Sequence, residues 1–200
     1  MKKITSIICI SLATMLISGA PITTPTSLTV KPEASKVEWF AEKVTGQHNG
    51  IVSMQSGTIE IEGEKIIGGN FVMDMTSIST TDLEGGSKKK LDDHLKSEDF
   101  FNTDEFGTAA FQINKAETLK NDKVFNHTIS GDLTIKGITH PVSFPASVKI
   151  VDGKLAAYGE ITVDRTKYDI KHGSASFFES IGDKAIMDEF LLKVSLGAKI

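Results

Sequence analysis

Arg165, in the stretch VDRTKYDI, is the side chain whose chemistry best suits the polar end of a ligand. A guanidinium carries five N–H donors in a planar fork, which can hold a phosphate or a quinone carbonyl. The same fork pairs readily with a carboxylate such as Asp164 or Asp169, so an internal ion pair is the favoured alternative. Trp39 and Tyr168 could each donate one further hydrogen bond, although such aromatics usually pack with their polar tips satisfied inside the protein.

The segment HLKSEDFFNTDEFG sets three aromatic side chains, Phe100, Phe101 and Phe106, among acids and lysine. They either cover the opening of an apolar interior and touch a ligand there, or they only close the end of a core, where most phenylalanines lie. A second aromatic pair, Phe177 and Phe178, occurs in the segment SASFFESIG.

No residue pattern indicates an enzyme or a metal site. None of the five histidines has a metal-type spacing such as H-x-x-x-H. Asp92–His94 could bind a surface metal, but the triplet is more typical of a solvated helix turn. The chain contains no G-x-S-x-G nucleophile elbow, and Gly68–Asn70 is typical of a turn rather than a phosphate loop. We therefore predict no catalytic residue and no metal ligand.

The composition narrows the classes of partner. The chain has 200 residues, which suits one domain or at most two, and 40% of them are hydrophobic, enough for a packed core. The net charge is -4 and no basic stripe is present, which argues against nucleic acid and against electrostatic docking on anionic lipid. The isolated run Lys88–Lys90 is interpreted as a solvated loop or helix face.

Residues 1–20 have the composition of a secretory signal peptide. Lys2 and Lys3 precede an apolar stretch that is too short and too interrupted for a spanning helix. The only cysteine, Cys9, lies in this leader, so the mature chain is predicted to have neither a thiol nor a membrane-spanning segment. Residues 21–34, rich in Pro, Thr and Ser, are predicted to form a linker. The protein is expected in the periplasm or secreted.

From residue 36 onward, apolar and polar residues alternate with the period of two that is typical of β-strands. Short turns separate about eight such runs, which predicts a mainly β protein with sequential antiparallel strands in a barrel or a sandwich. Asp152–Gly153 is a strong signal for a two-residue hairpin. Lys136–Gly137 is a weaker one, because lysine disfavours positive φ. Pro141 lacks a backbone N–H, so we expect it at a strand start or a bulge.

Two stretches interrupt the alternation and are predicted to form short helical insertions across the barrel ends. In the first, residues 83–101, Asp92–Leu95 has helical character and Ser97 could cap a second helix. The second covers residues 174–182. We expect the Phe-Phe pair of each insertion to turn inward.

One face of nearly every predicted strand is apolar, and methionine, small residues and single aromatics alternate along it. This mixture, with Ala157 and Gly159 among the small residues, favours a space along the barrel axis. A filled core is the alternative, because an eight-stranded barrel is just wide enough for its own side chains or one small ligand. The residues predicted to contact a ligand are Trp39, Phe71, Met73, Met75, Phe101, Phe111, Leu133, Phe144, Arg165 and Phe190.

Four segments, in this order along the chain, resemble the bacterial YceI-like family, also described as polyisoprenoid-binding or lipid-binding domains. They are VEWFAEKVTGQHNG, HLKSEDFFNTDEFGTAAF, GDLTIKGITHPVSF and ITVDRTKYDI. The resemblance covers about residues 35–199, and we assign residues 35–200 to one such domain. It implies an eight-stranded antiparallel lipocalin-like barrel with short helical insertions, an elongated apolar interior for a long isoprenoid-type chain, and a periplasmic location.

The sequence therefore predicts an exported, non-catalytic lipid-binding protein. Its expected partner is a long-chain apolar lipid, and no cofactor is expected beyond a bound isoprenoid lipid or quinone. The alternative is a dry-cored barrel that acts as an interaction or stress-response scaffold. The identity of the lipid and the formation of a homodimer stay open.

Overall fold

The computed structural model describes residues 24–120, 122–179 and 182–200, so the predicted signal peptide lies outside the described residues. The described residues contain nine strands, one α-helix and three short 3-10 helices. The strands are β1 (Thr26–Val30), β2 (Lys36–Lys43), β3 (Gly46–Glu62), β4 (Lys65–Thr80), β5 (Thr108–Thr118), β6 (His127–Ile135), β7 (Ile138–Val151), β8 (Lys154–Asp164) and β9 (Ile186–Lys199). The helices are η1 (Pro32–Ala34), α1 (Gly85–Lys96), η2 (Arg165–Tyr168) and η3 (Gly182–Lys184). In these ranges no helix has the length and apolar character needed to cross a membrane.

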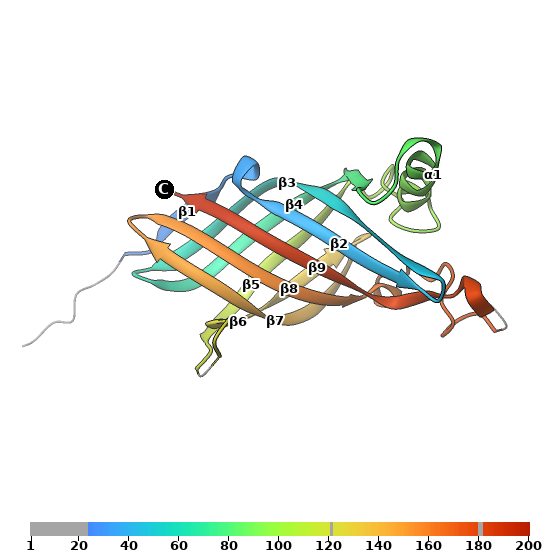
Figure 1. Cartoon of the computed structure of the whole chain (residues 1–200). Helices are drawn as coiled ribbons and strands as arrows, with labels where there is room; N and C mark the ends of the chain where they lie inside the picture. The colour runs from blue at the N-terminus through green and yellow to red at the C-terminus, as the bar shows by residue number, and fades with distance from the viewer. Residues whose placement is uncertain (1–23, 121, 180–181) are drawn as a thin grey trace, which may run out of the picture.

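Strands β2 to β9 form a closed antiparallel barrel of eight strands, which confirms the predicted fold class. Each strand pairs with the next along the chain, and β9 pairs with β2 to complete the ring. Figure 1 shows an elongated body with α1 at one end and the C-terminus at the other. We call the end next to α1 the mouth.

Strand β1 corrects the expectation that residues 21–34 form only a linker. It pairs with β3, where Thr29 faces Thr58, and with β9, where Val30 faces Ala198. It therefore lies between the same two neighbours as β2, from which η1 separates it. The short strand escaped detection because the prolines on both sides of it give the segment a linker-like composition.

Both predicted two-residue hairpins are present. Asp152 and Gly153 have φ values of 48° and 69°, and Lys136 and Gly137 have φ values of 50° and 71°. Type I′ turns require such positive values at both central residues. The lysine turn forms because the strands on either side, paired through Ile135 and Ile138, impose its geometry.

Pro141 lies within β7, opposite Asp132 and without a bulge, which differs from its expected position. The pairing of β7 with β8 begins only at Ala146, so this part of β7 has no partner on the β8 side. The Ala146 carbonyl accepts a hydrogen bond from the Asn126 N–H, toward β6. Because backbone groups alternate in direction along a strand, the missing N–H of Pro141 points to the unpaired side. Tyr168 of η2 packs there against His140, with ring centroids 5.3 Å apart.

Helix α1 is attached to the end of β4 by one carboxylate and one lysine. Asp92 accepts hydrogen bonds from the Thr80 N–H at 2.7 Å and from the Lys88 ammonium at 2.8 Å. Burial raises the pKa of Asp92, but these hydrogen bonds and the Lys88 charge outweigh it and lower the pKa below its ordinary value. The prediction that the lysine run is solvated is therefore wrong for Lys88, whose ammonium is bound to Asp92. Lys89, by contrast, pairs with Asp93 on the exposed face.

The helical insertions differ from the predictions in two respects. Ser97 ends α1, its N–H donating to the His94 carbonyl, and does not begin a second helix. The described residues 174–179 form turns, and Phe177 and Phe178 are each 51% exposed. The expectation that this second aromatic pair turns inward is therefore wrong.

Candidate functional site

The barrel interior holds two apolar compartments. The mouth compartment reaches Leu95 of α1 and Phe100 in the turn after it, and the deep compartment extends from there toward Ile59 and Leu155. They share four lining residues, Val37, Met73, Leu133 and Leu192, so they are contiguous. Their cavity volumes are only about 100 and 90 Å³, below the roughly 300–1,000 Å³ that is usual for ligand pockets. Much of this space is narrow, which suits a slender chain rather than a compact molecule.

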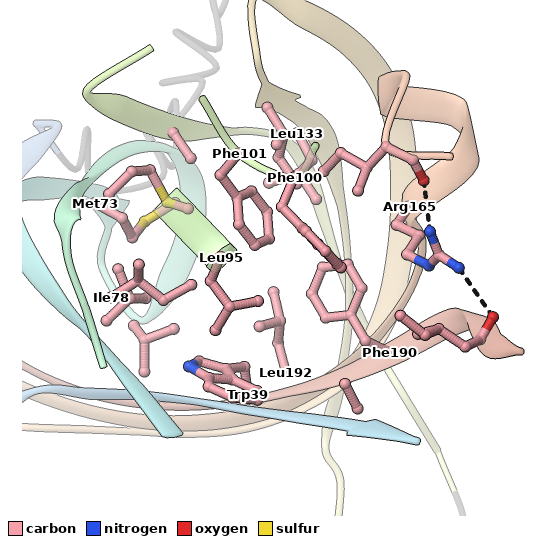
Figure 2. Close-up of a pocket in the computed structure, with 18 of the residues that line it drawn as sticks. Trp39, Met73, Ile78, Leu95, Phe100, Phe101, Leu133, Arg165, Phe190 and Leu192 are labelled. Carbon is pink, nitrogen blue, oxygen red and sulfur yellow. Dashed lines mark hydrogen bonds between the residues drawn. The ribbon is translucent and has the colours of Figure 1, made fainter. Parts of the chain in front are cut away.

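All ten residues predicted to contact a ligand line these compartments. Trp39, Met75, Phe101, Arg165 and Phe190 line the mouth compartment, Phe71, Phe111 and Phe144 line the deep compartment, and Met73 and Leu133 line both. Figure 2 shows how the side chains of the mouth compartment converge. The barrel register explains the agreement, because Phe71, Phe111 and Leu133 face one another across three neighbouring strands. Ligand contact itself stays a prediction.

The inward side chains of β9 are incompletely buried although they face the barrel interior. Leu192, Val194 and Leu196 line the deep compartment and are only partly buried. In a filled core such side chains would be enclosed on all sides by protein atoms, as protein interiors are close-packed. Their partial exposure indicates that they border open space.

Four interior aromatic rings occupy the places that glycines on neighbouring strands leave vacant. A Cβ atom on the glycine would lie 2.5 Å from the Trp39 ring at Gly50, 3.0 Å from Phe71 at Gly57, 2.7 Å from Phe111 at Gly131 and 3.0 Å from Phe144 at Gly159. Rings that pack over glycines cover the barrel wall instead of crossing the axis. At Gly159 the Phe144 ring takes up part of the space that the missing side chain leaves, although Gly159 still lines the deep compartment. Ala157 does line the deep compartment, as expected.

Trp39 lines the mouth compartment, but its unsatisfied indole N–H is buried and does not open onto that compartment. Its side chain is 7% exposed, and the indole Nε1 has no hydrogen-bond partner. We expected this tip to be satisfied by the protein, and that expectation is wrong. An unpaired buried donor costs about 1–3 kcal/mol, so such groups are rare in folded proteins.

Arg165 has no hydrogen-bond donor left for a ligand. Its guanidinium donates to four backbone carbonyls and weakly to one carboxylate, while its side chain is 5% exposed. The partners are Met187 O at 2.9 Å, Ile170 O at 2.8 Å, His172 O at 2.9 Å, Ile186 O at 2.9 Å and Asp188 Oδ1 at 3.5 Å. Figure 2 shows the guanidinium turned toward the chain around it. This geometry does not fit the head-group role and matches the alternative of an internal ion pair, with Asp188 in place of the acids nearer in sequence.

Hydrogen bonds and nearby charges set the protonation states of the Arg165–Asp188 pair. Burial lowers the pKa of Arg165, although the charges of Asp188 and Asp164 oppose this shift. Burial raises the pKa of Asp188, but hydrogen bonds from Ser174 and Ser176 and the charge of Arg165 lower it more. Asp188 is therefore held in its charged form, and the pair fixes the chain between β8 and β9.

The three phenylalanines at the mouth have different positions. Phe100 is 8% exposed and Phe101 is half-buried, and both line the mouth compartment. Phe106 instead lies near Gly137 of the β6–β7 turn, where a Cβ atom would be 3.4 Å from its ring. The first two therefore both close the barrel end and line its interior, while Phe106 supports the neighbouring turn.

One group of metal-ligand type gathers in the described part of the chain. His94, Asp99 and His172 place one ligand atom each within 4.8 Å of the others. Histidine spacing did not predict this group, because only the fold brings His172 next to the segment after α1.

Comparison with sequence families gives one match that spans most of the chain. A family model described as the YceI-like domain matches residues 28–198. A UPF0312 protein of Staphylococcus aureus is 34% identical over 91 residues, which cover 42% of this chain and 48% of that protein. Protein YceI of Escherichia coli is 30% identical over 128 residues, which cover 64% of this chain and 53% of that protein. The chain spans about half the length of the curated relatives it matches.

Solved structures share the fold at low sequence identity. The crystal structure of Burkholderia cenocepacia BcnA aligns with a TM-score of 0.64 and 19% identity, covering 85% of this chain and 99% of that chain. A polyisoprenoid binding domain from Saccharophagus degradans, described as implicated in plant cell wall breakdown, aligns with a TM-score of 0.58 and 11% identity. That alignment covers 86% of this chain and 97% of that chain.

Proposed function

Because this chain belongs to the YceI-like domain family, we propose that its barrel binds one slender, long-chain apolar lipid of isoprenoid type and does not transform it. The observation that carries the proposal is the pair of contiguous apolar compartments, whose inward β9 side chains are only partly buried. Burial of apolar groups stabilises a complex by roughly 0.8 kcal/mol per CH₂, so a long chain can bind tightly without many polar contacts. The similar fold of a polyisoprenoid binding domain supports the same ligand class.

The lining side chains also suit a flexible ligand. Met54, Met73 and Met75 face the compartments, and methionine side chains adapt to irregular shapes. The aromatic rings packed over glycines leave the axis free for a chain that lies along it. The narrow space favours a linear ligand with small branches, such as a prenyl chain, over a fused-ring lipid.

The experiment that tests this proposal is native mass spectrometry of the chain purified from a bacterial envelope, followed by titration of the lipid-stripped protein with a fluorescent prenyl analogue. We expect a co-purified species with the mass of an isoprenoid lipid or quinone, and saturable uptake with a stoichiometry of one. A protein that carries no lipid and takes up none would contradict the proposal and support the dry-cored scaffold.

We also propose that the chain is exported and that residues 1–20 are removed. Their composition supports this, with two early lysines followed by an apolar stretch. Intact mass measurement of the protein recovered from the periplasm or medium should give a product without Cys9. Recovery of a product that retains Cys9 would contradict export through a cleaved signal peptide.

A further inference from the structure

Two histidines and one aspartate gather on the outer side of the mouth. His94 Nε2 lies 3.3 Å and His172 Nδ1 lies 3.6 Å from the same oxygen, Oδ2 of Asp99. The three ligand atoms all lie within 4.8 Å of one another. Their side chains are 39%, 41% and 61% exposed, for His94, His172 and Asp99 in that order, so an ion can reach them from solvent.

Backbone hydrogen bonds hold the segments that carry these residues. His94 lies in the last turn of α1, and Asp99 lies in the turn that follows, which the Phe100 N–H closes by donating to the Ser97 carbonyl. On the other side, the His172 carbonyl accepts from Arg165 at 2.9 Å. The next carbonyl, that of Gly173, accepts from the Ile186 N–H at 2.8 Å. The backbone that carries the three residues is therefore fixed, and only their side chains need to move for all three to contact one ion.

The distances suit a small divalent ion. Bonds of 2.0–2.1 Å in a tetrahedral zinc site place neighbouring ligand atoms about 3.3 Å apart. Both distances to Asp99 are close to this value, and only the two imidazoles must approach each other. Three protein ligands would leave a fourth position for water.

We propose that His94, Asp99 and His172 form a site for a divalent first-row transition metal of the Zn²⁺ class. Two imidazoles favour Zn²⁺, Ni²⁺ or Cu²⁺ over Mg²⁺ and Ca²⁺, which prefer oxygen ligands. The alternative is that the three side chains make only direct hydrogen bonds and ion pairs. In that case the wild-type chain would bind Zn²⁺ no better than a variant without His172.

A metal at this site would tie together two segments that flank the mouth. His94 and Asp99 belong to α1 and its following turn, and His172 belongs to the turn after η2. Phe100 lies beneath both imidazoles, with ring centroids 4.8 Å from His94 and 5.3 Å from His172, and it lines the mouth compartment. If the barrel holds a lipid, a step that rests on the proposed function, the same ion would restrain the aromatic side chain at its entrance.

The site can be tested on the lipid-stripped full chain, purified without a histidine tag. Competition with a chromophoric chelator should give one Zn²⁺ per chain, and Co²⁺ should give a visible absorption band. His172→Ala should weaken Zn²⁺ binding by at least about 100-fold, since loss of even an outer-shell partner of a metal site costs 10- to 100-fold. Asp99→Asn should also weaken it. His48→Ala is the matched control, because His48 pairs with Asp82 and lies outside this group.

A second measurement separates a site that joins the two segments from a histidine that binds metal alone. Hydrogen exchange of the backbone amides in residues 97–103 and 170–173 should slow together when Zn²⁺ is added. The His172→Ala variant should show no such effect. Wild-type protein without Zn²⁺ binding, or His172→Ala with unchanged affinity, would overturn the proposal. Lipid uptake is not needed for either readout, so failure of the proposed function would leave this test intact.

Discussion

Ala157→Phe is expected to lower the affinity of the barrel for a long-chain isoprenoid by about 60-fold, while ligand-free stability changes little. Ala157 lies in β8 between Val148 and Leu196 and lines the deep compartment. A phenylalanine there would displace part of the ligand. Loss of about three buried CH₂ groups, at roughly 0.8 kcal/mol each, corresponds to this factor.

Ala156→Phe is the matched control for this variant. Ala156 is the preceding residue, exposed on the outer face of β8, so the same ring added there should leave uptake unchanged. The measurements are prenyl-analogue titration and thermal unfolding of the lipid-stripped proteins. In a filled interior, the ring at position 157 would overpack the core and cost about 1–3 kcal/mol of folding free energy. The open channel would be refuted if Ala157→Phe were destabilised and the wild-type protein took up no lipid.

Arg165→Leu is expected to reduce the free energy of unfolding by about 3–5 kcal/mol, because it removes five hydrogen bonds, four of them to backbone carbonyls, and the charge partner of Asp188. The carbonyls of Ile170, His172, Ile186 and Met187 would lose their donor. Such a loss is a large share of the 5–15 kcal/mol that stabilises a typical domain. Denaturant unfolding of the ligand-free chain gives the value.

Arg165→Lys distinguishes a structural arginine from a ligand-binding one. Lysine keeps the charge but has three donors on one nitrogen, which cannot reach all the carbonyls around the edge of the guanidinium. We expect a smaller but clear loss of ligand-free stability. If Arg165 held a ligand head group instead, Arg165→Lys would lower lipid affinity and leave ligand-free unfolding unchanged, which is the outcome that would contradict our assignment.

The sequence alone determined the strands and which of their residues face inward, and the resemblance to the YceI-like family selected a barrel over a sandwich. Alternation with a period of two is a local property, so it assigns each residue of a strand to one face. Once eight strands with one apolar face close into a ring, that face must point inward. This is why Phe71, Phe111 and Leu133 could be placed in the interior without knowledge of which strands they face. The hairpins at residues 136–137 and 152–153 could also be predicted from local sequence, since each turn depends on the types of two residues.

The tertiary structure decided what depends on neighbours across the sheet or between loops. Arg165 finds its acceptors in residues 170–188, and no spacing in the sequence predicts that four of them are backbone carbonyls. The aromatic rings fill glycine positions on adjacent strands, which only the cross-strand register aligns. The exposure of Phe177 and Phe178 was also undetermined by the sequence, because an apolar pair in a loop carries no periodicity to orient it.

His94, Asp99 and His172 show the same limit most clearly. Motif reasoning detects ligands that share one helix or one short loop, where spacing implies proximity. Here the third ligand comes from a turn after β8, and it meets the other two only because barrel closure brings that turn and α1 to the same end. The sequence gives the chemistry of each of the three side chains, whereas the short distances between them result from the strand pairings that close the barrel.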